Sequence, residues 1–260
     1  MTEGKNMNQS QRLIEIKKIL AKKKELQTKE IAAHFNISFD TARRDVLRLT
    51  STGQAVRVHG GIMAITASQV PAYITRSHIQ SPVKNKMAQA AKKFFLPGKF
   101  YFLGVSTSIA QMCNLINGID ASVLTNSLDN ALALMQSNFP TVSILAGQVN
   151  KTNRFIYSPQ ALEELNNVHF ETAFVGASKI NSDGLYVADQ RDAVTTGRAI
   201  SRADKTILFA EKYKFTTRNS SPYKTASLND IDILITDTVL PQEYRQWLDP
   251  HTQVIHVLEV

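Results

Sequence analysis

The chain has 260 residues, of which 43 % are hydrophobic and 20 % are charged, and its formal net charge is +8. This composition excludes a disordered or fibrous chain and can supply a sizeable core, in one large domain or in two smaller ones. The single cysteine, Cys113, excludes an intramolecular disulfide framework, and no apolar run is long enough to span a membrane, so we expect a soluble cytoplasmic protein.

The positive charge is concentrated near the amino terminus. Residues 1–61 contain twelve Lys or Arg and six acidic residues, so this first quarter carries +6 and the remainder carries +2. A basic segment on a near-neutral body indicates a polyanionic partner. Composition leaves open the alternative of a lysine-rich face that is only solvated.

Three helices are predicted in this basic segment. The first, over residues 9–22, has apolar residues at helical spacing. Thr28 is the expected cap of a second helix. After a short turn, Ser38 is the expected cap of a third, and Asp40 follows near the positive end of its dipole. Two short helices joined by a tight turn predict helix-turn-helix geometry.

The third helix has two different sides when its residues are placed at about 100° intervals. One sector is apolar and is predicted to pack on the first two helices; it contains Phe39, Ala42, Val46 and Leu49. The opposite sector is polar and contains Thr41, Arg44 and Arg48. With that side outward, the helix suits the major groove of DNA, where Arg donates two hydrogen bonds to a guanine edge.

The helical pattern alone does not assign three further side chains of this helix to either sector. Arg43 lies at the apolar border, so either it reaches a phosphate or its stem lies on the core. Asp40 and Asp45 are expected to orient the arginines through pairs three or four residues apart.

A β-strand is predicted after the third helix, over residues 55–58, and it ends before Gly60 and Gly61. Paired with a strand near residues 25–27, it forms a wing. Arg57 and His59 then lie beside the phosphate backbone. For His59, the competing interpretation is a structural or solvated histidine.

The amino-terminal segment resembles the signature of DeoR-type bacterial transcription regulators. The resemblance is carried by Arg12, Ile16 and Leu20, by the run from Ser38 through Thr41 to Val46, and by the trailing "VRVHGG". It implies a winged helix-turn-helix domain over residues 1–62 that binds double-stranded operator DNA. The DNA-binding residues that we expect are Thr28, Ser38, Thr41, Arg43, Arg44, Arg48, Arg57 and His59.

The larger part of the chain reads as a mostly parallel α/β domain over residues 82–260, preceded by a linker over residues 63–81. A helix is predicted from about Pro82 to Phe95, and apolar runs then alternate with helical stretches. Such runs indicate a parallel sheet covered on both faces. The predicted strands are residues 100–104, 122–126, 142–146, 172–176, 206–210, 232–236 and 254–258.

Small polar residues collect where these strands end, which is where parallel sheets bind ligands. Backbone amides and hydroxyls after the first strand make a candidate anion site. A Gly-Ser-Thr turn is more often only a turn, but several follow one another here. The candidate ligand-binding residues at these strand ends are Gly104, Ser106, Thr107, Ser108, Thr125, Asn126, Ser127, Gly147, Gly176, Asp183 and Lys214, and the family resemblance described next adds Asp192.

This part also resembles the effector domain of DeoR-type regulators, whose fold is related to ribose-5-phosphate isomerase. Tyr73, Arg76 and Lys86 fit the linker pattern, and "TNSL", "AFVGAS" and "IDILITD" fit the domain. The resemblance implies a site for a phosphorylated sugar that controls DNA binding. By analogy, Thr107 and Ser108 hold phosphate.

By the same analogy, Asn126 and Asp183 meet sugar hydroxyls and Lys214 meets charge. Four positions depart from the pattern of the family: Ser106 replaces Gly, Asp192 replaces Glu, Thr196 replaces a basic residue and Glu211 replaces Asp. A Cβ at Ser106 narrows the phosphate turn. The departures leave two alternatives open, an altered effector or a regulator that has lost its effector response.

The function predicted from the sequence is that of a repressor of a sugar or carbohydrate operon, acting as a symmetric dimer or tetramer. The competing hypothesis is a sugar-phosphate isomerase, but the sequence contains no legible acid–base constellation and we assign no catalytic residue. The histidines are dispersed and Cys113 has no cysteine partner, so we expect no metal and no cofactor. No membrane partner is expected.

Overall fold

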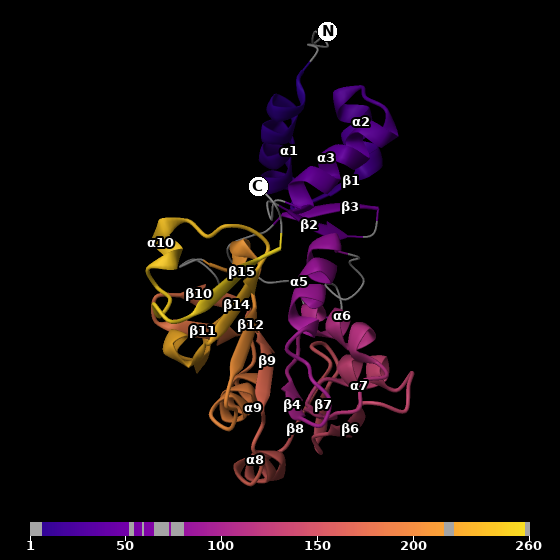
Figure 1. Ribbon diagram of the computed structural model, residues 1–260. Coiled ribbons are helices and arrows are strands. Elements are labelled where there is room, and N and C mark those ends of the chain that lie inside the picture. Colours follow the sequence, from indigo (N-terminus) through magenta and orange to yellow (C-terminus); the bar gives the residue numbers. More distant parts are fainter. Residues whose placement is uncertain are drawn as a thin grey trace. The chain divides into compact units, whose positions relative to one another are not determined.

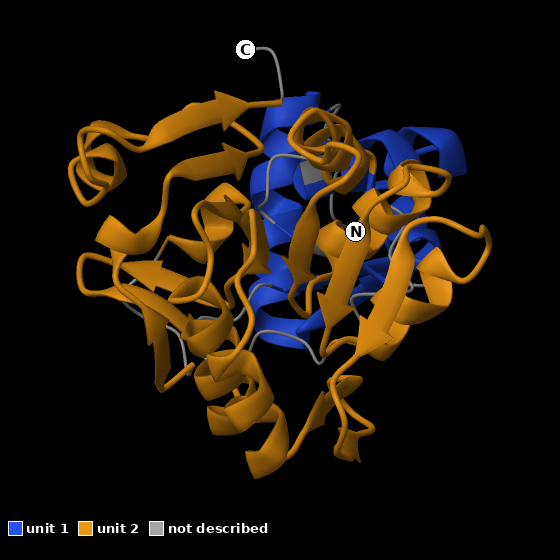
Figure 2. Cartoon of the chain, turned by 60° about the horizontal axis from the view of Figure 1, so that its bottom comes forward, with its two compact units in different colours: residues 1–71, 75–81 blue, residues 72–74, 82–260 orange. Residues whose placement is uncertain are grey.

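The computed structural model describes residues 7–51, 55–58, 60–64, 73, 81–215 and 221–257. The chain divides into two compact units, one made of residues 1–71 and 75–81 and the other of residues 72–74 and 82–260 (Figure 2). Each unit has hydrophobic clusters of its own, as expected for separate domains.

The first unit is a helical domain with a small sheet (Figure 1). Its described elements are α1 (Gln9–Lys23), β1 (Glu25–Gln27), α2 (Thr28–Phe35), α3 (Phe39–Ser51), β2 (Ala55–Val58) and β3 (Gly61–Ala64). The α2–α3 pair with its tight turn is the predicted helix-turn-helix. A cluster of buried side chains from all three helices and all three strands holds the unit together; it includes Ile16, Leu20, Leu26, Ile31, Val46, Leu49, Ala55 and Ile62.

Local hydrogen bonds fix where these helices begin and end. The Asn8 side chain accepts from the backbone amide of Gln11 at 3.0 Å and so caps α1. The cap of α2 is Gln27 and not Thr28, which corrects our prediction: Thr28 is the first helical residue, and its amide donates to the Gly60 carbonyl at 2.8 Å. Asn36, in the left-handed region at φ 49°, ends α2.

The wing has one strand more than we predicted. β2 pairs with β3 rather than with β1, and β3 lies in the middle of the order β1-β3-β2. β3 runs to Ala64, two residues into the segment that we assigned to the linker. Ile62 at its centre is fully buried, so this strand belongs to the core of the first unit.

The second unit is an α/β domain, as predicted. Its described elements are α5 (Pro82–Lys92), β4 (Phe100–Leu103), α6 (Thr107–Ile116), β5 (Ser122–Thr125), α7 (Leu128–Leu134), β6 (Thr141–Ile144), β7 (Gln148–Asn150), β8 (Phe155–Tyr157), α8 (Pro159–Asn166), β9 (Thr172–Gly176), β10 (Lys179–Asn181), β11 (Gly184–Val187), α9 (Gln190–Ile200), β12 (Thr206–Phe209), η1 (Lys212–Lys214), β13 (Tyr223–Ala226), η2 (Leu228–Asp230), β14 (Ile233–Thr236), α10 (Gln242–Arg245) and β15 (Gln253–His256).

The central sheet is parallel and has the strand order β15-β14-β12-β9-β4-β5-β6. The chain proceeds outward from β4 to β5 and β6, and then returns to β9 on the other side of β4. Ligands of open α/β sheets bind at such a reversal, outside the carboxyl ends of the strands. The ends of β4 and β9 therefore mark the expected binding crevice.

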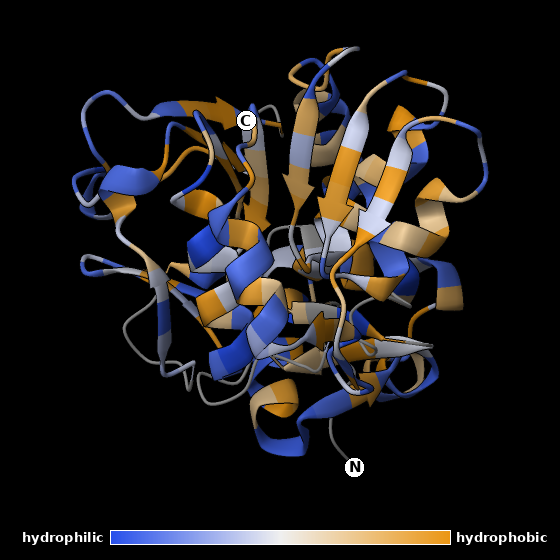
Figure 3. Ribbon diagram, turned by 90° about the horizontal axis from the view of Figure 1, so that it is seen from below, coloured by the Kyte–Doolittle hydropathy of each residue, from blue (hydrophilic) through white to orange (hydrophobic). Residues whose placement is uncertain are grey.

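Alternate residues of each strand point to opposite faces of this sheet, and both faces are covered by helices. Tyr101 and Leu103 of β4 belong to a core that also receives side chains of α5 and α6. Phe102, between them, belongs to a second core with side chains of α8 and α9. Figure 3 shows the sheet strands largely in the colours of hydrophobic residues.

All seven strands predicted for this sheet are present. The predicted helix also begins at Pro82 but ends at Lys92 rather than at Phe95. Five short strands were not predicted: the hairpin β7–β8 and the small antiparallel sheet β10-β11-β13.

Candidate functional site

The outward face of α3 is strongly basic. Ala42, Val46 and Leu49 are fully buried, which confirms the apolar side of the helix. Arg43, Arg44 and Arg48 are exposed, so all three guanidinium groups lie on the side away from the core. Arg43 therefore lies on the exposed face of the helix and not against the core. Thr41 is half-buried and lies at the border of that exposed face.

Phe39 is not part of the packed side, contrary to our prediction. Its side chain is 51 % exposed. On a helical wheel the buried sector is centred between Ala42 and Asp45, and Phe39 lies at its edge. The opposite edge of the buried sector holds a carboxylate.

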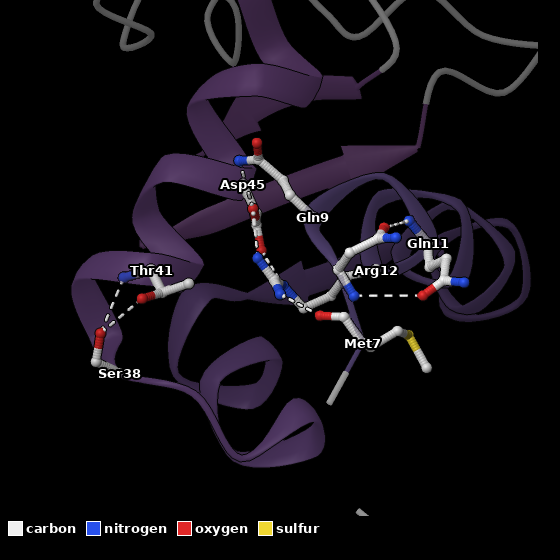
Figure 4. A network of polar contacts seen from close by, with 8 residues as sticks. Met7, Gln9, Gln11, Arg12, Ser38, Thr41 and Asp45 are labelled. Carbon is white, nitrogen blue, oxygen red and sulfur yellow. Dashed lines mark hydrogen bonds and ion pairs between the residues drawn. The ribbon is translucent and has the colours of Figure 1, made fainter. Parts of the chain in front are cut away.

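That carboxylate belongs to Asp45, which is fully buried and pairs with α1 rather than with the arginines of α3 (Figure 4). Its oxygens accept from Arg12 Nε at 2.5 Å and from Arg12 Nη2 at 3.2 Å. Gln9 Nε2 donates to the same carboxylate at 3.0 Å. Our prediction that Asp45 orients neighbouring arginines is therefore wrong; it anchors α3 to α1 instead.

Ser38 caps α3 as predicted. Its Oγ accepts from the backbone amide of Thr41 at 3.1 Å and lies 2.8 Å from the Thr41 hydroxyl (Figure 4). The Ser38 carbonyl also accepts from the Ala42 amide at 3.0 Å. These bonds fix the first turn of the helix, which carries the side chains nearest to a groove that the helix enters.

On the wing, Arg57 lies in β2 opposite Ile62 of β3. Its side chain is half-buried, and its buried Nη1 has no hydrogen-bond partner within the described part of the chain. A guanidinium with an unused donor can bind a phosphate. His59, which we grouped with Arg57, lies outside the described residues.

In the second unit, the end of β4 leads into a buried polar turn. Gly104 follows the strand, Ser106 caps α6, and Thr107 and Ser108 open the helix. The Ser106 Oγ accepts from the Ser108 amide at 3.3 Å. Ser106, Thr107 and Ser108 are each at most 5 % exposed. Hydroxyls and helix amides together make an anion-binding geometry.

The end of β5 is tied to the end of β4 by buried side chains. The Thr125 hydroxyl donates to the Leu103 carbonyl at 2.5 Å. Asn130 Nδ2 donates to the Leu103 and Gly104 carbonyls at 3.3 and 3.0 Å. Ser127 caps α7 by accepting from the Asn130 amide at 3.3 Å. Our prediction omitted Asn130, because a polar residue in a first helical turn reads as exposed.

Several buried oxygens at the ends of the parallel strands have no hydrogen-bond partner among the described residues, Oδ1 of Asn130 included; two more of them belong to residues that follow β5 and β12. They are Oδ1 of Asn126, which is fully buried, and Oε1 of Glu211, which is 7 % exposed. Asn126 Nδ2 donates to Asp192 Oδ1 at 3.4 Å, and the Thr196 hydroxyl donates to the same oxygen at 3.3 Å. Buried acceptors without donors mark places where a ligand hydroxyl can bind.

The backbone needs glycine at positions 176 and 147 for different steric reasons. A Cβ at Gly176 would lie 2.9 Å from both Cβ and Oγ of Ser106, so the glycine lets the ends of β9 and β4 approach each other. Gly147 has φ 142°, and a Cβ there would lie 2.2 Å from the Tyr157 carbonyl oxygen. The hairpin backbone alone therefore requires glycine at 147.

Asp183 and Lys214 occupy other surroundings. The Asp183 carboxylate accepts from the Tyr186 hydroxyl and from Lys224 Nζ, the latter at 2.9 Å. These bonds, that with Tyr186 first, lower the pKa of Asp183. Lys214 ends η1 and is 4 % exposed. The structure thus places Asp183 in a pair across the small sheet, and Lys214 beside the segment of Glu211.

The described ranges of the chain lack two features. They contain no group of three or more His, Cys, Asp and Glu side chains that could hold a metal ion. None of their helices combines the length and the apolar character needed to cross a bilayer.

The chain is similar to known proteins in both units. A DeoR-like helix-turn-helix domain matches residues 12–68, and a DeoR C terminal sensor domain matches residues 79–238. The HTH-type transcriptional repressor GlcR of Bacillus subtilis is 30 % identical over 244 residues, which cover 94 % of each chain. The glycerol-3-phosphate regulon repressor of Escherichia coli is 24 % identical over 94 % of this chain and 97 % of that one.

One further relative and one solved structure are also similar to the chain. The lactose phosphotransferase system repressor of Streptococcus mutans is 25 % identical over 96 % of this chain and 100 % of that one. Among solved structures, ribose 5 phosphate isomerase A from Neisseria gonorrhoeae aligns with a TM-score of 0.40 and 16 % identity, covering 53 % of this chain and 55 % of that chain.

Proposed function

The chain belongs to the DeoR family of transcription regulators, and from that premise we propose that it represses a carbohydrate operon under the control of a phosphorylated sugar. Its nature as a DNA-binding transcription regulator follows from the family. Relatives that span nearly the whole chain bear the names of transcriptional repressors, among them those of a glycerol-3-phosphate regulon and of a lactose phosphotransferase system. The operon class and the metabolite are the proposed part.

The observation that carries the DNA-binding half is the basic outward face of α3. Three exposed arginines stand on a helix whose other side is fully packed. In our proposal α3 enters the major groove, where Arg44 donates to a base edge, and Arg43 and Arg48 reach base edges or phosphates. Ser38 and Thr41 at the first turn, and Arg57 on the wing, add contacts to the backbone of the duplex.

The metabolite site is proposed at the reversal of strand order. The turn at Ser106 to Ser108 offers hydroxyls and helix amides for a phosphate. The partnerless oxygens of Asn126 and Glu211 are acceptors that sugar hydroxyls would satisfy. The replacement at Asp192 does not break this arrangement, because the shorter carboxylate still accepts from Asn126. These contacts favour a retained effector response over a lost one.

Regulation requires that the metabolite bind one arrangement of the protein more tightly than another, because equal affinity shifts no equilibrium. One α3 helix supplies few base contacts, so we propose a homo-oligomer, a dimer or a tetramer, that reads repeated half-sites. We place the protein in the bacterial cytoplasm because its operator DNA is there.

We propose a binding role rather than sugar-phosphate isomerisation for the second unit. Support comes from the full-length relatives, whose names are those of regulators. The test is incubation of the purified protein with ribose 5-phosphate: formation of the ketose would overturn this part of the proposal.

The central experiment has two steps. First, fragments of the source genome are selected on the purified full-length protein, and enrichment of a common site next to carbohydrate genes is expected. Second, sugar phosphates are titrated while the thermal midpoint and the affinity for the selected site are followed. No enriched site would contradict the DNA-binding role, and a selected site with no response to any sugar phosphate would contradict the effector.

A further inference from the structure

Phe39 is a large apolar side chain at an unusual place. It is the first residue of α3, directly after the cap Ser38, and 51 % of its side chain is exposed. The hydrophobic cluster of the described part of the first unit takes Ala42, Val46 and Leu49 from this helix and does not include Phe39. Packing of the unit therefore does not account for this phenylalanine.

The position of Phe39 relative to DNA follows from the proposed function, on which this inference rests. When a recognition helix enters the major groove, the residues near its amino terminus contact base edges. The Ser38–Thr41 bonds hold the backbone of this first turn, so the Cα atom that carries the Phe39 ring has a fixed position. Leu47, also exposed, lies about 12 Å further along the helix axis and hence further from the entry point.

The surroundings of Phe39 favour a nucleic acid over an apolar protein partner. Arg43 lies about one helical turn from Phe39 on the exposed face of α3, and Arg44 and Arg48 continue that face round the helix. The one exposed carboxylate of α3 is that of Asp40. A partner that covers this face must bring several negative charges together with an apolar contact. Duplex DNA offers both, because the thymine C5-methyl group projects into the major groove between two rows of phosphates.

The chemistry of the ring narrows what it can recognise. A phenyl group has no hydrogen-bond donor or acceptor, so it cannot read the polar edge of a base pair. Among the groups that a major groove presents, the thymine methyl is the apolar one. We propose that Phe39 contacts the methyl group of one thymine in each half-site and thereby specifies that base.

The test starts from the site that the full-length wild-type protein selects from random duplexes. Each thymine of that site is then replaced by uracil, which pairs in the same way but lacks the methyl group. We expect one replacement per half-site to weaken wild-type binding about fourfold, the size expected for one methyl group removed from water. The Phe39→Ala protein should bind the thymine and uracil versions of that position equally.

Two control variants keep the test decisive. Ile14→Ala removes an apolar side chain of α1 that is also 51 % exposed, and it should retain the full response to uracil. Phe39→Leu keeps an apolar side chain at the same position and should retain part of the response, which separates the contact from any effect of Phe39→Ala on folding.

Three outcomes would overturn the inference. In the first, no thymine is sensitive to replacement by uracil. In the second, Phe39→Ala retains the sensitivity. In the third, Phe39→Ala weakens both versions while their ratio stays at the wild-type value, so the ring contributes without reading the methyl group. A failure of the proposed function looks different, because the wild-type protein then selects no sequence at all.

Discussion

Arg12 and Asp45 form a buried ion pair between α1 and α3, with Nε and Oδ2 2.5 Å apart and side-chain exposures of 9 % and 0 %. The two residues are 33 positions apart in the sequence. Because Asp45 stands in the buried sector of α3, the pair fixes how the helix is rotated about its axis. The same pair therefore determines which side chains α3 turns outward.

Replacing Asp45 by Ala should destabilise the first unit by about 3–5 kcal/mol, because it leaves the guanidinium of Arg12 buried without a counter-charge. The measurement is denaturant unfolding followed by circular dichroism. A matched control is Glu15→Ala, which breaks the exposed Lys18–Glu15 pair and should cost about 0.5 kcal/mol or less. The double variant Arg12→Met/Asp45→Met should recover most of the loss, and equal effects of Asp45→Ala and Glu15→Ala would refute the anchoring role.

Replacing Arg44 by Ala should weaken binding to the selected operator by about 1–3 kcal/mol if its guanidinium reads a base. The measurement is a gel-shift titration against the operator and against an unrelated duplex. Affinity for the unrelated duplex should fall much less, since the base contact is specific. Lys18→Ala on α1, whose side chain is 66 % exposed, is the control and should leave specificity unchanged. Unchanged operator affinity in Arg44→Ala would exclude base reading by this residue.

Replacing Gly176 by Ala should destabilise the second unit by about 1–3 kcal/mol, because the new Cβ meets Ser106 at 2.9 Å. If sugar phosphates bind at the turn from Ser106 to Ser108, as proposed, Gly176→Ala should also reduce the rise in thermal midpoint on their addition, because the turn must shift. The double variant Ser106→Gly/Gly176→Ala removes both atoms that the new Cβ meets. It should regain stability relative to Gly176→Ala, since glycine is a tolerable helix cap. If the double variant is the less stable of the two, the close approach is not the cause.

Cys113 should be unreactive toward thiol reagents while the protein is folded. The side chain is fully buried, and this burial raises the pKa of its thiol well above the ordinary value of 9.0. Ellman's reagent at pH 8 should therefore react on the timescale of unfolding, and guanidinium chloride should make the reaction fast. As the chain has one cysteine, the signal has a single source. Rapid reaction of the native protein would show that the helix α6 opens readily.

The same pKa shift gives a dependence of stability on pH. Above pH 9.0 the unfolded thiol loses its proton while the buried thiol keeps it. The unfolded state then binds fewer protons, so the free energy of unfolding contributed by this group falls as the pH rises. Below that pH both states are protonated and the contribution is constant. Cys113→Ala should remove this part of the alkaline decline in stability.

Much of the fold was predictable from the sequence because its strands are near-continuous apolar runs. Buried parallel strands such as β12 and β14 need apolar residues toward both faces, and a run such as "TILF" carries that signal without context. The short strands β10 and β13 have half-exposed, mixed compositions. They are set by pairing with a neighbour, which a single sequence does not reveal.

The site was less predictable, for two physical reasons. From the helical pattern alone, a carboxylate is predicted to lie on the surface. Asp45 is buried instead, because the guanidinium of Arg12, which is far away in the sequence, neutralises its charge. Phe39 was expected inside for the converse reason, as apolar residues at a sector border can turn either way. The polar turn at Ser106 could be predicted, because the carboxyl ends of parallel strands lie at one edge of the sheet. Asn130 reaches that edge only through a tertiary contact, its bond to the Gly104 carbonyl, which the sequence does not reveal.

The middle position of β3 has a mechanical consequence. The strand ends at Ala64. β3 is bonded to β1 on one flank and to β2 on the other. Separating β3 from this sheet must therefore break both ladders at once, whereas an edge strand can be peeled away from a single neighbour. The ladder with β1 reaches the start of α2, which follows β1 without a gap.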